Sequence, residues 1–193
     1  MTSLSSQHID ARKEQRQTRA AIFSSGIFLM LTTSTVISAG GLRVNFTESM
    51  PQGLYKVVVL SRRLNRGDLV SVCAPSSAAT LGRQRGYLAT GECVGGSEPL
   101  LKIVAALSGD RVLTGPSGVT VNGSLLPHTN YLSNDAMGRP MQRWPSRYFV
   151  MGPRTIWLYA PFWRSWDSRY WGPVEVSSVL GIAVPVFVFT RSD

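Results

Sequence analysis

The sequence predicts a mainly β domain that follows one apolar segment near the N-terminus. Short runs rich in valine, leucine and aromatic residues recur between glycines and prolines, as expected for short strands. An Asn-Gly pair lies between alternating residues, which is a strong signal for a hairpin. No amphipathic helix of ordinary length, repeat or low-complexity tract is evident in the sequence after residue 43. Many short strands of this kind are typical of a β-barrel or a β-sandwich.

The N-terminal part of the chain predicts a membrane anchor. Residues 20–42 contain no charged residue, and these 23 residues are enough to cross a hydrocarbon core of about 30 Å as a helix. Residues 1–19 form a basic tail, so the positive-inside rule predicts that the tail stays in the cytoplasm and that residues 43–193 are exported. A cleaved secretory signal is the alternative, because "VISAGG" offers small residues for a cut after Ala39. In either case the folded domain works outside the cytoplasm.

The strands expected in the exported domain are enriched in β-branched and aromatic residues. In chain order they are "LYKVVVL", "DLVSVC", "LLKIVAAL", "RYFVM", "TIWLY" and "PVFVF". The hairpin is expected in "GVTVNGSLLP", with Asn122 and Gly123 at its turn. Residues 74–98 are expected to form a long loop that projects from the domain and is held by two cysteines.

These cysteines, Cys73 and Cys93, predict a disulfide, because an even number of cysteines in an exported domain favours pairing. Closing the loop between them adds about 3 kcal/mol to stability in the chain-entropy model. Two free buried thiols are the alternative. Of the two histidines, His8 lies in the predicted cytoplasmic tail, which leaves His128 in the exported domain. Two cysteines and one histidine fall short of four zinc ligands, so neither a metal nor another cofactor is expected.

The net charge of +9 and the pI of about 10.3 invite the hypothesis of a nucleic-acid-binding protein. The distribution of charge argues against it. The 20 basic residues include three lysines, the arginines are scattered, and no nucleic-acid-binding motif is evident. A basic surface that faces anionic lipid or a charged partner explains the charge equally well.

A nucleophile candidate, Ser49, lies in "NFTESMPQGLY", directly after the predicted anchor. Pro51 stiffens this stretch, and Gly53 restores freedom two residues later. The alternative is an ordinary turn that leads into a strand.

The base that would activate this serine has two candidates. His128 is expected in a solvated loop. Lys102 lies inside the apolar run "PLLKIVAAL", where burial would lower its pKa and allow the neutral amine to act as a base. Lys56, at the start of a strand, is expected to be exposed. A lysine at a sheet edge that extends its ammonium into solvent is the alternative for Lys102.

Three motifs occur in a defined order: "SMPQGLY", then "LLKIVAALSGDRV", then "SWDSRYWGPV". This order and spacing resemble the type I signal peptidases. The Ser-Met-Pro form with Gly-Leu-Tyr close behind is most similar to their TraF branch, the conjugal-transfer peptidases that mature pilin subunits. The resemblance covers roughly residues 20–190. It implies a signal-peptidase-like β-domain, a Ser/Lys mechanism and no cofactor.

The resemblance also implies roles for single residues. Ser49 matches the nucleophile and Lys102 the general base. Thr47 matches the hydroxyl that holds the oxyanion together with the backbone N–H of Ser49. Ser165 matches the hydroxyl that orients the lysine amine.

Four further positions match residues that support such a site. They are Gly109 and Asp110 after the lysine strand, and Asp167 and Arg169 in the last motif. The spacing of the last two on an extended strand is expected to place both on one face. An ordinary surface ion pair is the alternative for Asp167 and Arg169.

Two features depart from general signal peptidases and favour the TraF branch. The stretch Gly-Asp-Asn-Arg before the last motif is absent, and the short segment between Lys102 and Ser165 leaves no room for a large second domain. The implied enzyme is held in the inner membrane with its domain in the periplasm. It cuts an exported pilin precursor and either hydrolyses or cyclises it; the sequence leaves both outcomes open.

Three alternatives remain. The first is a general signal peptidase for precursors that carry a signal peptide. The second is a non-catalytic periplasmic β-domain of a transfer or secretion complex. A soluble self-cleaving repressor is the third, but the apolar segment and the cysteine pair argue against it.

Overall fold

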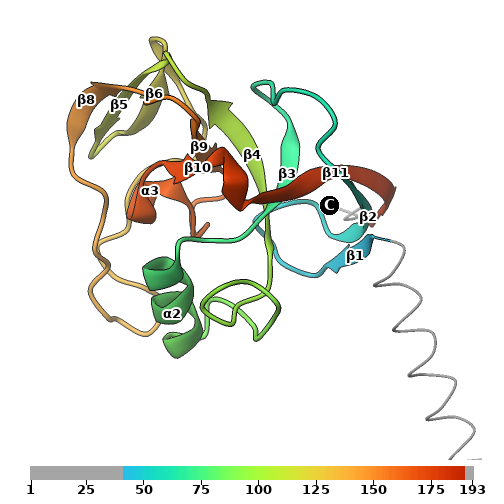
Figure 1. Cartoon of the computed structure of the whole chain (residues 1–193). Helices are drawn as coiled ribbons and strands as arrows, with labels where there is room; N and C mark the ends of the chain where they lie inside the picture. The colour runs from blue at the N-terminus through green and yellow to red at the C-terminus, as the bar shows by residue number, and fades with distance from the viewer. Residues whose placement is uncertain (1–40, 190–193) are drawn as a thin grey trace, which may run out of the picture. The chain divides into compact units, whose positions relative to one another are not determined.

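Two β-sheets make up the computed structural model, which describes residues 41–189 (Figure 1). The larger sheet has seven strands in the order β1-β2-β11-β3-β4-β9-β10, and the smaller sheet has four in the order β7-β6-β5-β8. The larger sheet curls from β1 and β2 toward β9 and β10 (Figure 1). The mainly β class predicted from the sequence is therefore confirmed.

The elements have the following bounds. The larger sheet consists of β1 (Leu42–Asn45), β2 (Gly53–Val58), β3 (Leu69–Val72), β4 (Leu100–Ala106), β9 (Thr155–Tyr159), β10 (Val174–Glu175) and β11 (Val179–Val188). The smaller sheet consists of β5 (Arg111–Gly115), β6 (Gly118–Val121), β7 (Ser124–Leu125) and β8 (Arg147–Val150). The helices are α2 (Ser76–Gln84), α3 (Ser168–Trp171) and the short 3-10 turn η1 (Val176–Ser178).

Strand β4 lies between β3 and β9 and pairs antiparallel with both. Its Val104 and Ala106 are fully buried, because the strand is apolar along almost its whole length. One core cluster joins β3, β4 and β9 to α2 and α3, with Ala79 and Tyr170 contributed by the helices. A second cluster fills the space between β4, β9 and the smaller sheet. Both cores thus meet at the strand that carries Lys102.

The predicted hairpin is present in the smaller sheet. Asn122 and Gly123 have φ angles of 50° and 89°, the left-handed values that a two-residue turn of type I′ requires. They connect β6 to β7, where Val121 lies opposite Ser124.

The loop predicted for residues 74–98 is partly wrong, since residues 76–84 form α2. Pro75 precedes the helix, and its fixed φ suits a helix start. The buried positions of α2 are the small residues Ala78, Ala79 and Gly82, so the helix packs closely without the apolar stripe that would reveal it in the sequence.

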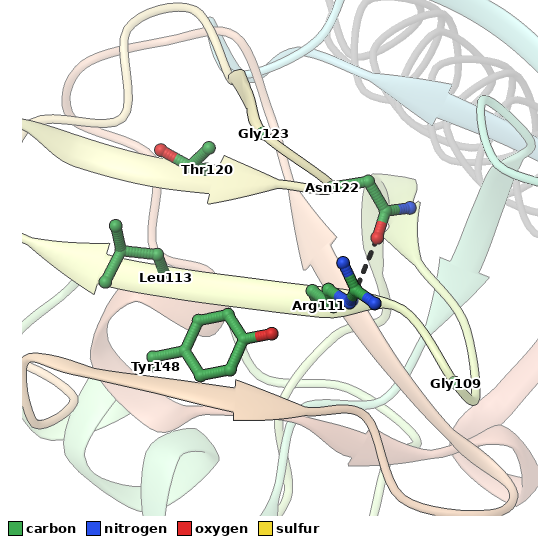
Figure 2. Close-up of a pocket in the computed structure, with 7 residues that line it drawn as sticks. All are labelled: Gly109, Arg111, Leu113, Thr120, Asn122, Gly123 and Tyr148. Atoms are coloured by element: carbon green, nitrogen blue, oxygen red, sulfur yellow. Dashed lines mark hydrogen bonds between the residues drawn. The ribbon is translucent and has the colours of Figure 1, made fainter.

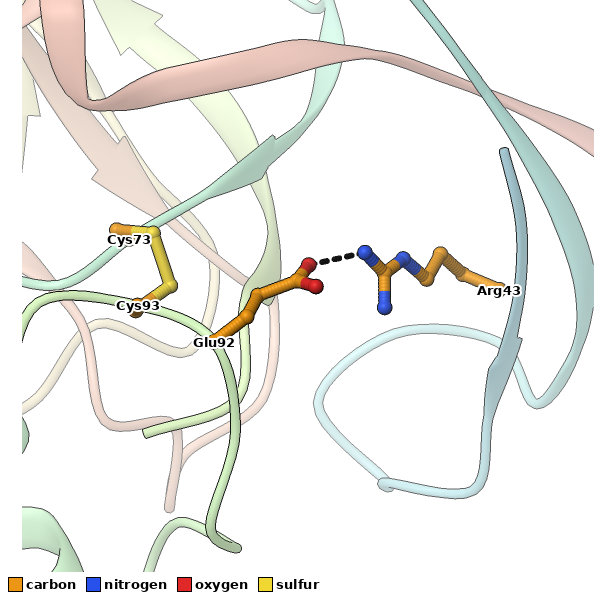
Figure 3. The surroundings of a disulfide bond; sticks show 4 residues. All are labelled: Arg43, Cys73, Glu92 and Cys93. Atoms are coloured by element: carbon orange, nitrogen blue, oxygen red, sulfur yellow. Dashed lines mark hydrogen bonds and ion pairs between the residues drawn. A yellow bond between two sulfur atoms is a disulfide. The ribbon is translucent and has the colours of Figure 1, made fainter. Parts of the chain in front are cut away.

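The predicted disulfide joins Cys73, just after β3, to Cys93 in the loop after α2 (Figure 3). The Cα atoms of the pair are 5.5 Å apart. Beside it, Arg43 forms an ion pair with Glu92 and links β1 to the same loop (Figure 3). The disulfide is confirmed, and the alternative of two free thiols does not hold.

The predicted tail of residues 1–19, and the predicted membrane segment apart from its last two residues, lie outside the described residues. From residue 41 to residue 189, no helix has the length and apolar character needed to cross a membrane.

Candidate active site

The turn between β1 and β2 carries Ser49, and buried contacts fix its shape. The side-chain amide of Asn45 donates from Nδ2 to the carbonyl oxygens of Met50 at 2.9 Å and Pro51 at 3.0 Å. The hydroxyl of Tyr55 donates to the same Pro51 oxygen at 2.6 Å. Met50 is itself buried. The residues on either side of the nucleophile therefore belong to the framework rather than to a loose loop.

Gly53 allows the end of this turn to approach β11. A Cβ at this position would run into the carbonyl oxygen of Phe187, so no larger residue fits without a shift of the backbone. The backbone N–H of Phe189 also donates to the carbonyl of Gln52 at 2.8 Å. The turn is thus held against the last strand of the sheet.

Two side chains contact the Ser49 hydroxyl. Lys102 Nζ donates to Ser49 Oγ at 3.4 Å, and Thr47 Oγ1 lies 3.1 Å from the same atom. The fold therefore brings together three residues that lie on two separate segments of the chain. Ser49 is half-buried and Thr47 is exposed, so the hydroxyls face a side from which a substrate can approach.

Lys102 is only 1 % exposed, and it pairs with Val70 across β3 and β4. Burial lowers the pKa of the Lys102 amine from 10.5 to about 8. The nearby carboxylate of Asp167 raises this pKa, and the guanidinium of Arg169 lowers it. A lysine with this pKa supplies a neutral amine at mildly alkaline pH. Because the side chain is buried, the alternative of a lysine at an exposed sheet edge does not hold.

Lys56 and the second base candidate, His128, lie at the surface. Lys56 is exposed on β2, as expected. His128 is exposed in a turn, and its contribution to the site is its backbone carbonyl, which accepts from Arg169 Nη1 at 2.9 Å.

Asp167 and Arg169 form an ion pair in which both side chains are fully buried, with Arg169 Nε 2.9 Å from Asp167 Oδ1. The alternative of a surface pair is therefore wrong. So is the extended strand expected here: Asp167 is the N-cap of α3, and its carboxylate accepts from the backbone N–H of Arg169. The carboxylate also accepts from the N–H of Ala160 at 3.2 Å. The pair joins α3 to the end of β9.

The guanidinium of Arg169 also holds two loops by their backbone. It donates to the carbonyl oxygens of Phe162 at 2.9 Å and Ser165 at 3.1 Å, besides that of His128. Ser165 is buried, and within the described residues its hydroxyl has no hydrogen-bond partner. The orientation of Lys102 by Ser165 therefore stays a prediction.

Gly109 and Asp110 form the turn between β4 and β5. Gly109 has a φ of 86°, which the turn requires of it. The carboxylate of Asp110 accepts from the side chain of Arg66, from the N–H of Leu107 and from the amide of Asn122. The bonds to Arg66 are the main cause that holds the pKa of Asp110 down to about 2. This turn fastens the end of the lysine strand.

A hollow of about 550 Å³ lies on the smaller sheet (Figure 2). It is lined by Gly109, Arg111, Leu113, Thr120, Asn122, Gly123 and Tyr148. Neither Ser49 nor Lys102 borders it, so it is separate from the candidate active site. Over the described part of the chain, no group of three or more His, Cys, Asp or Glu residues is placed to hold a metal ion.

Sequence reasoning missed Asn45. It stands two residues before Thr47, at the end of β1, and its side chain touches both sides of the nucleophile turn. The signal available in the sequence was an asparagine between a predicted strand and a proline-containing turn, a position where asparagine commonly bonds to the backbone.

Comparison with known proteins agrees with the geometry. A sequence profile of the family described as signal peptidase, peptidase S26, matches residues 15–188. The chain belongs to this family. The resemblance to signal peptidases is therefore confirmed, and the chain is a member of a family of serine proteases.

Two curated relatives are conjugal transfer proteins. The chain is 40 % identical over 177 residues to the conjugal transfer protein TraF of Agrobacterium tumefaciens, covering 90 % of this chain and 98 % of that one. It is 36 % identical over 184 residues to a probable conjugal transfer protein TraF of Sinorhizobium fredii, covering 94 % and 96 %. The resemblance to the TraF branch is thereby confirmed.

Among solved structures, a signal peptidase I from Enterococcus faecalis aligns with a TM-score of 0.36 and 17 % identity. The alignment covers 63 % of this chain and 97 % of that one. A score this low adds no argument.

Proposed function

We propose that this chain is a membrane-anchored endopeptidase with a Ser49–Lys102 dyad, and that it matures an exported pilin precursor in conjugal transfer. The observation that carries the proposal is the contact of 3.4 Å between Lys102 Nζ, buried in β4, and Ser49 Oγ in the nucleophile turn. Membership of the signal peptidase family supports the reaction class, and both relatives named above support the role in conjugation.

In the proposed reaction, neutral Lys102 accepts the proton of Ser49 while Oγ attacks the carbonyl carbon of the scissile peptide. The protonated lysine then gives this proton to the leaving amine, and an acyl-enzyme on Ser49 remains. Water resolves the ester to a free carboxylate, or the amine of a pilin N-terminus resolves it to a cyclic product. Both outcomes share one acyl-enzyme and regenerate neutral Lys102.

The Thr47 hydroxyl and the backbone N–H of Ser49 stabilise the negative charge of the tetrahedral intermediate. The Thr47 hydroxyl supports this role because it lies 3.1 Å from Ser49 Oγ, on the exposed side of the turn. One such donor contributes roughly 3 kcal/mol of transition-state stabilisation.

The buried ion pair of Asp167 and Arg169 supports the site and acts on Lys102 through its charges. The carboxylate favours the charged amine and the guanidinium favours the neutral one, so the pair leaves burial as the dominant influence. Ser165, with its unused buried hydroxyl, is the proposed partner that orients Lys102.

Apolar side chains around the turn support an approach to the membrane. Phe46, within the turn, is 75 % exposed, and Phe187 on β11 is 60 % exposed next to β2. Aromatic residues favour the membrane interface. Trp163 is also exposed, whereas Met50 and Trp166 belong to the core. Residues 20–42 remain the proposed anchor, and they would place Ser49 beside the apolar leader that it cuts.

A general signal peptidase is the second candidate, and the description of the matching family favours it. Co-expression separates the two functions. The chain is produced in cells with a pilin precursor or with an unrelated secreted precursor, and the intact mass of each product is measured. The proposal predicts conversion of the pilin precursor only, and none by the Ser49→Ala variant. Equal conversion of both precursors would favour the general peptidase.

A further inference from the structure

The amide of Asn45 bridges the two halves of the nucleophile turn. Its Nδ2 faces the carbonyl oxygens of Met50, Pro51 and Thr47, and its Oδ1 faces the backbone N–H and the hydroxyl of Thr47. Carbonyl oxygens only accept hydrogen bonds, so this orientation of the amide is the one that its neighbours permit. Asn45 is buried and can satisfy both ends at once.

The hydrogens in this network can be assigned one by one. Asn45 Oδ1 carries no hydrogen, so in its contact of 2.7 Å with Thr47 Oγ1 the threonine hydroxyl is the donor. A hydroxyl has one hydrogen, and this one is then engaged. In the contact of 3.1 Å between Thr47 Oγ1 and Ser49 Oγ, the serine is therefore the donor. Lys102 donates in turn to Ser49.

We propose that Asn45 is a positioning residue that acts on the reaction through Thr47, which deepens and rests on the proposed Ser/Lys function. By accepting the Thr47 hydroxyl, it holds Oγ1 against Ser49 and makes it an acceptor in the resting enzyme. The hydrogen of Ser49 then points away from Lys102 until substrate arrives. When the oxyanion forms, the Thr47 hydroxyl leaves Asn45 and donates to the oxyanion from a side chain that is already in place.

This role differs from simple support of the turn. If Asn45 only held the backbone at Met50 and Pro51, its loss would slow the reaction equally whether or not position 47 carries a hydroxyl. If it acts through Thr47, the loss matters less once that hydroxyl is gone. Neighbouring groups that act together show such non-additive effects, and distant independent groups do not.

The test is a double-mutant cycle of Asn45→Ala and Thr47→Val, measured as kcat and KM for conversion of a purified pilin precursor by the full chain in detergent. Asn45→Ala should lower kcat about tenfold or more with a small change in KM. The factor by which Asn45→Ala lowers kcat should be at least about fivefold smaller in the Thr47→Val background than in the wild-type background. Equal factors in the two backgrounds would overturn the proposal.

A matched control comes from Gln52, whose side chain clamps the same turn by donating to the carbonyl oxygen of Phe46 at 2.7 Å. Gln52→Ala should lower kcat by the same factor in both backgrounds, because its amide makes no hydrogen bond to Thr47. If the factor for Gln52→Ala shrinks in the Thr47→Val background as much as that for Asn45→Ala, a general weakening of the turn explains both, and the proposal is overturned.

Thermal unfolding identifies variants that fail to fold. If Asn45→Ala does not fold, Asn45→Ser replaces it, because a serine hydroxyl in a shorter side chain can still donate to one carbonyl oxygen of the turn. Its effect on kcat must again shrink in the Thr47→Val background, and an undiminished effect contradicts the proposal.

Ser49→Ala is run in the same assay. Conversion by Ser49→Ala would overturn the dyad itself, whereas equal factors with an inactive Ser49→Ala variant overturn the role of Asn45 alone.

Discussion

Lys102 combines two properties that oppose each other, full burial and an ionisable amine. In water the amine holds its proton up to about pH 10.5, and in the fold it does so only to about pH 8. The difference corresponds to roughly 3 kcal/mol. At neutral pH the charged, buried amine therefore destabilises the fold. The proposed chemistry accounts for its presence, because it needs an amine that can lose its proton.

The rate should follow the fraction of neutral Lys102. Because burial lowers the pKa of this amine to about 8, kcat/KM should rise about tenfold per pH unit below pH 8 and level off above it. The measurement is precursor conversion between pH 6 and about pH 10 in buffers of constant ionic strength. A rate that falls across this range would contradict a neutral lysine base.

Lys102→Met should stabilise the fold while it abolishes activity. The unfolded chain binds the lysine proton at pH values where the folded chain has released it, so stability rises with pH from about 8 to 10.5. Below pH 8 the charged, buried amine destabilises the fold, and methionine removes this penalty of up to about 3 kcal/mol. Urea unfolding at pH 7 and pH 10.5 should show a gain for the variant that shrinks at the higher pH. A less stable variant at pH 7 would contradict it.

Single residues differ in how far the sequence revealed them. The apolar neighbours of Lys102 on both sides favoured its burial, but a lysine at a sheet edge stayed the alternative, because the neighbours do not show that β4 is paired on both sides. The bonds of Asn45 depend on a turn that folds back over six residues, and no local pattern encodes that reach. The unpartnered hydroxyl of Ser165 likewise depends on packing between distant loops.

Among the elements, α3 owes its position to the ion pair at its start. Asp167→Ala would leave Arg169 charged and buried with only backbone carbonyls as partners, and loss of one member of such a pair costs about 3–5 kcal/mol. We expect a lower midpoint in denaturant and reduced expression, with turnover per folded molecule affected less. Asp167→Asn is the control, because it keeps the shape and part of the cap. A variant as stable as the wild type would contradict a supporting role.

The loop that contains α2 depends on the disulfide. Cys73→Ser combined with Cys93→Ser should lower the free energy of unfolding by about 3 kcal/mol, because it restores the freedom of that loop in the unfolded chain. Glu92→Gln, which breaks the neighbouring exposed ion pair with Arg43, should change it by at most about 1 kcal/mol. Denaturant unfolding in the absence of reductant compares the two, and effects of equal size would contradict the prediction.

Elements were predictable where their residues carry the period of the structure. The strands β4 and β9 are apolar runs of the length of a buried strand, and the turn of Asn122 and Gly123 has chemistry that only a tight hairpin needs. Helix α2 was not predicted, because small residues and not a large apolar stripe form its buried face. The two-residue strands β7 and β10 are too short to have a period of their own.

For the whole molecule, the order of the motifs was the decisive information, because it linked the turn of Ser49 to the strand of Lys102 across half of the domain. The closure of the two segments into one site depends on β11, which lies between β2 and β3 in the larger sheet. That pairing joins the last strand of the chain to one of the first, and no short pattern in the sequence shows it.

The Ser49–Lys102 mechanism is tested by Lys102→Arg, because arginine keeps the positive charge but does not lose its proton in proteins. The variant is co-expressed with the pilin precursor beside wild type, Ser49→Ala and Lys102→Met, and thermal unfolding checks that each is folded. The intact mass of the precursor should show conversion by wild type and none by the three variants. Conversion by folded Lys102→Arg at the wild-type rate would contradict a lysine base and require another group to activate Ser49.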